Sequence, residues 1–181
     1  MSRIIFATGN QNKMREIREI MQGFQVDGEN VEILSMKEAG VYAEIVEDGK
    51  TFAENAAIKA KAIAALTPGD FVMADDSGLE IDALNKEPGI YSARYQGEDT
   101  SYRIKNAKLI ERLNGVPDEK RMARFVCAIV TVLPDGTLLT TEGTIEGRIG
   151  YEEKGNNGFG YDPIFLVPPY IPTSPELTQE E

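Results

Sequence analysis

Residues 51–69 constrain the fold more than any other part of the chain. Thr51 followed by Glu54 matches a helix capping box, and alanines and isoleucines then recur with helical spacing until Pro68-Gly69 ends the run. The apolar segment Phe71–Ala74 follows at once and is typical of a buried strand. A long helix that leads directly into a buried strand predicts an α/β fold.

The rest of the chain adds strands and two more helices to this unit. Arg3–Ala7 is strand-like, and Met14–Met21 carries apolar residues at helical spacing, with a polar, glycine-containing loop between the two. A third helix is expected at Thr100–Leu113, and further strands at Val31–Leu34, Phe125–Leu133, Thr137–Thr141, Thr144–Ile149 and Ile164–Val167. Because β-α units are combined with a hairpin around Pro134-Asp135-Gly136, a mixed β-sheet flanked by helices is favoured over a doubly wound parallel sheet.

Length and residue usage limit the possible chemistry. The chain of 181 residues suits one domain, residues 1–181, or two tightly joined lobes. Its single cysteine, Cys127, lies in an apolar run, so a buried inert thiol is expected and an internal disulfide is excluded. With no histidine, His-dependent triads and HExxH zinc sites are excluded as well. Proton transfer then depends on Asp, Glu, Lys, Tyr or Cys, with carboxylates the first candidates.

Charge and hydropathy indicate the partners. A net charge of −11 argues against binding to a nucleic acid polymer or an anionic membrane, because both require a basic surface. A small anionic substrate remains compatible, since a few lysines and a divalent ion can hold it. The apolar runs are too short to cross a bilayer, and the N-terminus shows no signal peptide. A cytoplasmic protein is expected.

The loop Thr8–Lys13 is a candidate phosphate site. It lies between a strand and a helix, and backbone N–H groups at a helix N-terminus favour phosphate. Gly9 permits close approach of the backbone, and Lys13 adds a positive charge. The alternative is an ordinary strand–helix turn with an asparagine cap and a solvated lysine.

Three carboxylates form a candidate metal site. Asp75 and Asp76 follow a buried strand, where two adjacent charges are costly unless a cation or hydrogen bonds compensate them. Together with Glu47 they suit Mg²⁺, which prefers one or two carboxylates plus water and substrate phosphates. Lys59 could point toward the same place from the helix. The alternative is that residues 75–78 form a polar turn with both acids in solvent.

A glycine-rich loop at Gly155–Gly160 is a candidate base site. Glycines let the backbone approach a flat ligand, while Phe159 or Tyr161 could stack on it. The alternative is a tight connection whose aromatic rings fill the edge of the core.

These features, taken in order, resemble the inosine triphosphate pyrophosphatase family. Six segments carry the resemblance: ATGNQNK (Ala7–Lys13), EDGKTFAENAAIKA (Glu47–Ala60), ADDSGLEIDAL (Ala74–Leu84), PGIYSARY (Pro88–Tyr95), ARFVCA (Ala123–Ala128) and GFGYDPIF (Gly158–Phe165). Each segment alone has low specificity. Six in register along nearly the whole chain are highly specific, and they favour the functional interpretations above.

The resemblance implies both a fold and a reaction. The fold would be an elongated α/β structure with a mixed β-sheet flanked by helices, in which two lobes surround a central cleft for the nucleotide, usually as a homodimer. The reaction would be Mg²⁺-dependent hydrolysis of non-standard purine nucleoside triphosphates (ITP, dITP, XTP). Water attacks the α-phosphorus, and the products are the monophosphate and pyrophosphate.

The resemblance also assigns roles to residues. Thr8, Gly9, Asn10, Gln11, Asn12 and Lys13 would cradle the triphosphate, Glu47 and Asp76 would bind Mg²⁺, and Asp76 would also act as general base. Asp75 and Lys59 would support catalysis, Ser77 would contact the substrate, and Phe159, Gly160, Tyr161 and Asp162 would border the base. Charge neutralisation and positioning by Mg²⁺ and lysines are what phosphoryl chemistry requires.

The sequence departs from the family pattern at its end. Family members continue beyond a Thr-x-x-Glu-Leu stretch, here Thr173–Leu177, into a lysine and a Ser-His-Arg motif that contact the phosphates and the purine 6-oxo group. This sequence stops at Glu181, before that motif. The C-terminal segment is therefore expected to be truncated, and this form is expected to discriminate poorly among purines and to turn over slowly.

Two other functions stay open at this point. One is a related pyrophosphatase acting on modified pyrimidine nucleotides or dinucleotides, against which the GFGYDP loop argues. The other is a nucleotide-binding module that is inactive because its C-terminal motif is lost. Release of pyrophosphate in the presence of Mg²⁺ separates an enzyme from a binding module.

Overall fold

The computed structural model describes residues 1–155 and 159–168, which form three α-helices and eight β-strands. The helices are α1 (Gln11–Ile20), α2 (Phe52–Ala64) and α3 (Tyr102–Arg112). The strands are β1 (Ser2–Phe6), β2 (Gln25–Val26), β3 (Glu29–Ser35), β4 (Phe71–Ile81), β5 (Glu87–Pro88), β6 (Met122–Val132), β7 (Leu138–Ile149) and β8 (Phe165–Leu166). Among these described helices, none has the length and apolar character needed to cross a membrane.

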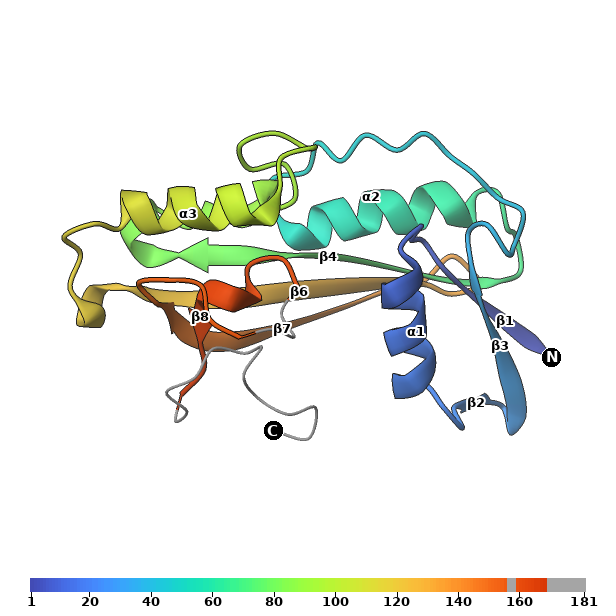
Figure 1. The fold of residues 1–181 in the computed structure, drawn as a ribbon. Coiled ribbons are helices and arrows are strands. Elements are labelled where there is room, and N and C mark those ends of the chain that lie inside the picture. The colour runs from blue at the N-terminus through green and yellow to red at the C-terminus, as the bar shows by residue number, and fades with distance from the viewer. Residues whose placement is uncertain (156–158, 169–181) are drawn as a thin grey trace. The chain divides into compact units, whose positions relative to one another are not determined.

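The strands form one mixed sheet with the order β2-β3-β1-β4-β6-β7-β8, and β5 pairs with β4 (Figure 1). β1 runs parallel to β3 and to β4, with Ile4 opposite both Ile33 and Phe71. The pairs β2–β3, β4–β5 and β7–β8 are antiparallel. The predicted α/β fold with a mixed sheet is confirmed.

The chain divides into two compact units. The first comprises residues 1–76 and 128–142, and the second comprises residues 77–127 and the chain from Gly143 onward. The strands β4, β6 and β7 each carry residues of both units. The cleft between two lobes that the resemblance implies stays a prediction.

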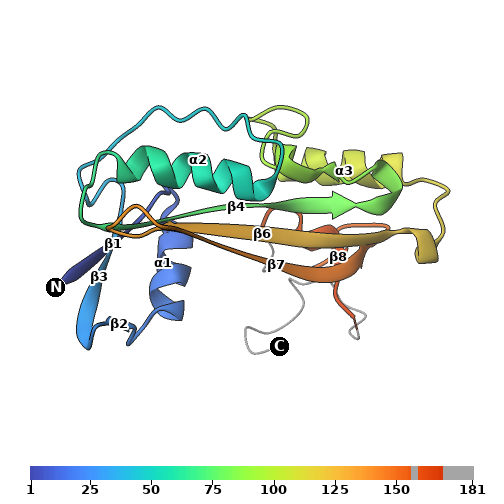
Figure 2. The same ribbon diagram turned by 180° about the vertical axis from the view of Figure 1, so that it is seen from behind.

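The first unit has its core between the sheet and α2. Ala56, Ala60 and Ile63 lie on one face of α2 and pack against strand residues Ile5, Val72 and Ala74, all of them buried. Figures 1 and 2 show α1 on the side of β1 opposite α2. Thr51 caps α2 by accepting a hydrogen bond from the Glu54 backbone, as the capping box predicted.

The second unit has a separate core beneath α3. Leu109 and Leu113 at the C-terminal end of α3 join Leu79 and Ile81 of β4, together with Ile164 and Phe165. The helix begins after the cap Ser101 and is followed by Gly115 in the left-handed conformation, so the predicted third helix is confirmed within two residues.

The structure corrects the polar turn considered at residues 75–78. β4 runs through these residues without interruption. Val72 and Ala74 face the core of the first unit, whereas Leu79 and Ile81 face that of the second. The buried positions of β4 therefore change from even to odd within residues 75–78. The acidic pair lies where this alternation breaks.

The second difference concerns the hairpin after β6. The turn at Pro134-Asp135-Gly136 is confirmed by the hydrogen bond from the Leu133 N–H to the Thr137 carbonyl. The two short strands predicted at Thr137–Thr141 and Thr144–Ile149 are instead one continuous strand, β7. Gly143, between the two predicted ranges, lies within this strand.

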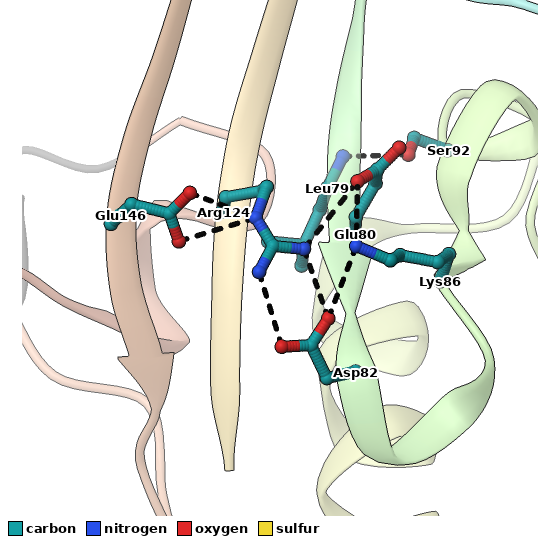
Figure 3. A network of polar contacts seen from close by, with 7 residues as sticks. All are labelled: Leu79, Glu80, Asp82, Lys86, Ser92, Arg124 and Glu146. Atoms are coloured by element: carbon teal, nitrogen blue, oxygen red, sulfur yellow. Dashed lines mark hydrogen bonds and ion pairs between the residues drawn. The ribbon is translucent and has the colours of Figure 1, made fainter.

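A network of ion pairs links neighbouring strands of the second unit (Figure 3). Arg124 on β6 binds both carboxylate oxygens of Asp82, at 2.9 and 3.1 Å, and its Nε lies 2.9 Å from Glu146 on β7. Glu80 and Lys86 complete the network. The hydrogen bonds from Arg124 hold the pKa of Asp82 below its usual value. Bidentate geometry of this kind fixes the register of adjacent strands.

Gly147 on β7 is predicted to be essential for stability. A β-carbon at this position would collide with the Leu166 carbonyl oxygen and lie 2.6 Å from Cζ of the buried Phe165. We expect Gly147→Ala to lower the free energy of unfolding by about 2–3 kcal/mol through overpacking, measured by urea denaturation. Gly143→Ala on the same strand is the control, because a β-carbon there meets nothing within 4 Å. Equal stability of the two variants would contradict the prediction.

Candidate active site

The loop between β1 and α1 lies beside β4 at the acidic pair. The Ala7 N–H donates to the Met73 carbonyl at 2.8 Å, which extends the parallel ladder between β1 and β4. Asn10 is the N-cap of α1, and its Oδ1 accepts hydrogen bonds from the Asn12 and Lys13 N–H groups. The Asn10 N–H donates to Thr8 Oγ1. The predicted phosphate loop is therefore a well-ordered helix start next to the predicted metal ligands.

Lys13 connects this loop to the acidic pair. Its Nζ lies 2.7 Å from Oδ2 of Asp75, whose side chain is 8% exposed. The ion pair offsets much of the cost of burying a carboxylate in the sheet. It also corrects the alternative in which Asp75 points into water, whereas the Lys13 side chain is still 37% exposed.

Gly9 lies at an open position of this loop. A β-carbon at position 9 would meet nothing within 4 Å among the described residues, and the backbone there is not in the left-handed region. Neither space nor conformation therefore demands glycine in the free protein. The open space over this backbone would permit the close approach of a ligand.

The start of α2 is tied to the segment that carries Glu47. The Gly49 N–H donates to Oδ1 of the buried Asn55 at 2.8 Å. A β-carbon at Gly49 would lie 2.6 Å from that oxygen, so the segment can pack this closely only with glycine. Lys59, one turn further along α2, binds Glu47 with its Nζ 3.1 Å from Oε1. The predicted approach of Lys59 to Glu47 is present in the structure.

Asp76 completes the cluster. Burial raises its pKa, while the positive charge of Lys59 and a hydrogen bond from Asn55 lower it, and the charges of Glu47 and Asp75 raise it. Glu47 is therefore close enough to act electrostatically on Asp76. The Oδ2 atom of Asp76 is buried and accepts no hydrogen bond within the described part of the chain. The three carboxylates of this cluster are accompanied by the ammonium groups of Lys13 and Lys59. The cluster therefore has an excess of one negative charge, and the Oδ2 atom of Asp76 can accept a further bond.

The carboxylate oxygens of Glu47 and Asp76 fit a magnesium ion whose coordination is completed by water and a bound substrate. Within residues 1–155 and 159–168, no group of three or more His, Cys, Asp or Glu side chains is arranged to hold a metal ion alone. Mg²⁺ takes one or two carboxylates and retains water or substrate phosphates as its other ligands. The buried, unsatisfied oxygen of Asp76, with Glu47 nearby, meets that requirement.

The predicted base-binding residues lie in the second unit and differ in exposure. Phe159 is 68% exposed, whereas Tyr161 is only 4% exposed and donates its hydroxyl proton to the Ser92 carbonyl. A stacking surface is thus available on Phe159, while the Tyr161 ring fills the core, as one of the sequence interpretations proposed. Gly160 has a left-handed backbone with φ of 60°, and Asp162 begins the short helix η4 (Asp162–Ile164). Residues 156–158 of the loop lie outside the described residues.

Ser77 and the C-terminal motif complete the sequence predictions. Ser77 follows Asp76 on β4 and its side chain is exposed, as a substrate contact requires. The predictions for the tail, including Thr173–Leu177, fall outside the described residues.

Asn55 is a site residue to which the sequence analysis gave no role. It is 1% exposed and connects the Gly49 N–H with the Asp76 carboxylate. A signal was available, because an asparagine in an alanine-rich helix is unfavourable unless its amide has partners. Its position one turn before Lys59 places both on the face that carries the site.

Taken together, the mixed α/β fold and this cluster define a class of protein suited to polyphosphate chemistry. A helix N-terminus and two lysines can hold an anionic chain, and the carboxylates can hold a divalent cation and take up a proton.

Comparison with known proteins gives the family. A model of the Ham1 family matches residues 4–181. The dITP/XTP pyrophosphatase of Exiguobacterium sibiricum is 47% identical over 179 residues, which cover 99% of this chain and 87% of that protein. The dITP/XTP pyrophosphatase of Clostridium perfringens is 47% identical over 186 residues, covering 100% and 89%. The structure of a HAM1 protein from Coxiella burnetii has a TM-score of 0.88 and 38% identity, covering 99% and 89%. The chain belongs to the Ham1 family.

Proposed function

We propose that the protein hydrolyses non-standard purine nucleoside triphosphates such as dITP and XTP to the monophosphate and pyrophosphate. The observation that carries the proposal is the cluster of Glu47, Asp75 and Asp76, balanced by Lys13 and Lys59 beside the start of α1. Membership of the Ham1 family and the names of the similar proteins from two bacteria support the substrate class.

The triphosphate is assigned to the first unit. The loop Thr8–Lys13 offers helix N-terminal amides, the Lys13 ammonium group and open space over Gly9. In the free protein Lys13 and Lys59 are held by carboxylates. A bound divalent cation would neutralise the acids, and Lys13 and Lys59 could then donate to the phosphate oxygens.

Glu47 and Asp76 are the residues that would hold Mg²⁺. When bound, the ion would supply charge neutralisation at the phosphates and lower the pKa of the attacking water. Asp76 is assigned the role of general base, because its unsatisfied oxygen can accept the proton of that water. Asp75 would keep Lys13 beside the loop until the phosphates bind. The attacking water then forms a bond to the α-phosphorus. The bond between this phosphorus and the oxygen that bridges it to the β-phosphorus breaks, and pyrophosphate leaves.

The base is assigned to Phe159 and its neighbours in the second unit, where an exposed ring follows a glycine-rich segment. A homodimer and a cytoplasmic location are further parts of the proposal. They are supported by the family resemblance and by the composition of the chain.

Isotope labelling tests the reaction directly. The protein is incubated with XTP, ITP, dITP, ATP and a methylated pyrimidine triphosphate, with Mg²⁺ or with chelator, in H₂¹⁸O. We expect Mg²⁺-dependent pyrophosphate release that is faster with XTP and dITP than with the pyrimidine, with the label in the monophosphate. Label in pyrophosphate or orthophosphate would contradict attack at the α-phosphorus. Binding of XTP without any release of pyrophosphate would instead indicate an inactive nucleotide-binding module.

A further inference from the structure

Two residues of α3, Tyr102 and Asn106, contact the segment that carries Phe159, and Lys105 lies on the same face of the helix. Tyr102, Lys105 and Asn106 are spaced i, i+3 and i+4, so they line the same side of the helix. Lys105 and Asn106 are each 1% exposed, although both are polar. Burial of this kind is costly and requires specific partners.

Asn106 holds the backbone of that segment. Its Nδ2 donates to the Gly160 carbonyl at 3.1 Å and to Glu153 Oε1 at 2.9 Å. Gly160 has the left-handed backbone that turns the chain directly after Phe159. The hydrogen bond to the Gly160 carbonyl therefore restrains the backbone directly after Phe159, and the bond to Glu153 holds the Asn106 amide in place.

Tyr102 provides the surface beneath the ring. Its centroid lies 6.1 Å from that of Phe159, with a tilt of 44°, and 5.1 Å from that of Tyr161, edge to face. Both distances fall in the range of favourable aromatic pairs. Phe159 is thus exposed on one side and supported on the other.

Lys105 contacts the Tyr102 ring through its ammonium group. Its Nζ lies 4.6 Å from the centroid of the Tyr102 ring and donates to the Ala93 carbonyl at 2.7 Å. The neighbouring Ser92 accepts the Tyr161 hydroxyl proton at its carbonyl and the Leu79 N–H at Oγ (Figure 3). The support of Phe159 therefore reaches back through buried hydrogen bonds to β4.

We infer that Tyr102 and Asn106 are positioning residues for the purine: they hold Phe159 in the orientation that binds the base, and so they set the part of substrate affinity that depends on the base. The inference rests on the proposed function, because it takes Phe159 as the base contact. Neither residue lies in the first unit, to which the triphosphate is assigned. Their replacement should therefore weaken binding of nucleotides without weakening binding of a polyphosphate that has no base.

Asn106→Asp and Tyr102→Leu test the inference. The aspartate keeps the shape but replaces the donor with a charged acceptor that faces Glu153 and the Gly160 carbonyl, and the leucine removes the ring beneath Phe159. For each variant we expect the KM for XTP to rise about tenfold, with kcat changed less than twofold. The inhibition constant of inorganic tripolyphosphate should stay at the wild-type value. A raised KM for XTP with an unchanged inhibition constant for tripolyphosphate indicates positioning. A loss of folded protein would instead lower the apparent kcat and leave both constants unchanged.

Matched controls and a binding measurement complete the test. Tyr102→Phe keeps the ring and should behave as wild type. Asn114→Asp makes the same chemical change as Asn106→Asp at an exposed position just after α3. Calorimetric titration with xanthosine monophosphate measures the effect without catalysis, so it applies even if XTP is not hydrolysed and the proposed function fails. Unchanged affinity for XMP in both variants, or an equal loss of affinity for XMP and tripolyphosphate, would overturn the inference.

Discussion

Asp76→Asn is expected to lower the rate of pyrophosphate release by about 10³-fold or more, because the substitution removes both the proposed general base and one of two proposed metal ligands. The melting temperature should stay unchanged or rise. The buried Oδ2 of Asp76 accepts no hydrogen bond from the described residues, and two other carboxylates act on it, so an uncharged amide relieves repulsion in the free protein. Loss of activity together with retained stability is typical of a residue selected for chemistry.

Steady-state kinetics with XTP and differential scanning calorimetry measure the two effects on one preparation. Asp99→Asn is the control, because it makes the same chemical change on an exposed side chain of the second unit. Its rate and melting temperature should match those of the wild type. If Asp76→Asn retained more than a tenth of the wild-type rate, the general base would have to be assigned to another group.

Arg121→Met is expected to lower the free energy of unfolding by about 3–5 kcal/mol. Arg121 is 1% exposed, and its guanidinium donates to four carbonyl groups, those of Leu113, Val116, Ile149 and Gly150. These bonds join the end of α3 to the end of β7, and the guanidinium lies 4.1 Å from the ring centroid of Tyr151. Methionine preserves much of the volume but leaves four buried acceptors without these donors.

Urea denaturation followed by circular dichroism gives the stability, and Arg103→Met on α3 is the control. Arg103 is exposed, so the same replacement there should change stability by less than about 0.5 kcal/mol. A similar small effect for Arg121→Met would mean that water replaces the lost donors. Pyrophosphate release by the folded fraction should be unaffected in either variant, because neither arginine contacts the site.

The sequence was sufficient where local physics decides the outcome. The Thr51 cap, the alanine-rich face of α2 and the turn at residues 134–136 each depend on neighbours only a few positions away. The sequence analysis also expected Lys59 to point from this helix toward the candidate metal site, and the structure pairs it with Glu47.

The sequence was not sufficient where distant neighbours decide. Residues 75–78 have the composition of a turn, yet they form strand, and Lys13 compensates the charge of Asp75 from 62 positions away. Buried polar groups were missed for the same reason. Arg121, Lys105 and Asn106 have the residue types of a solvated surface, and only the folded chain supplies the carbonyl groups and aromatic ring that make their burial possible.

The uninterrupted course of β4 has a consequence for how such a chain can change over time. Adding or removing one residue between Ala74 and Leu79 would turn all later side chains of the strand over, which would place Leu79 and Ile81 on the wrong face and misdirect the carboxylates of the site. The number of residues in this interval therefore cannot vary. The turn at residues 134–136 is exposed and carries no residue of the site, so insertions and deletions are expected to accumulate there rather than in β4.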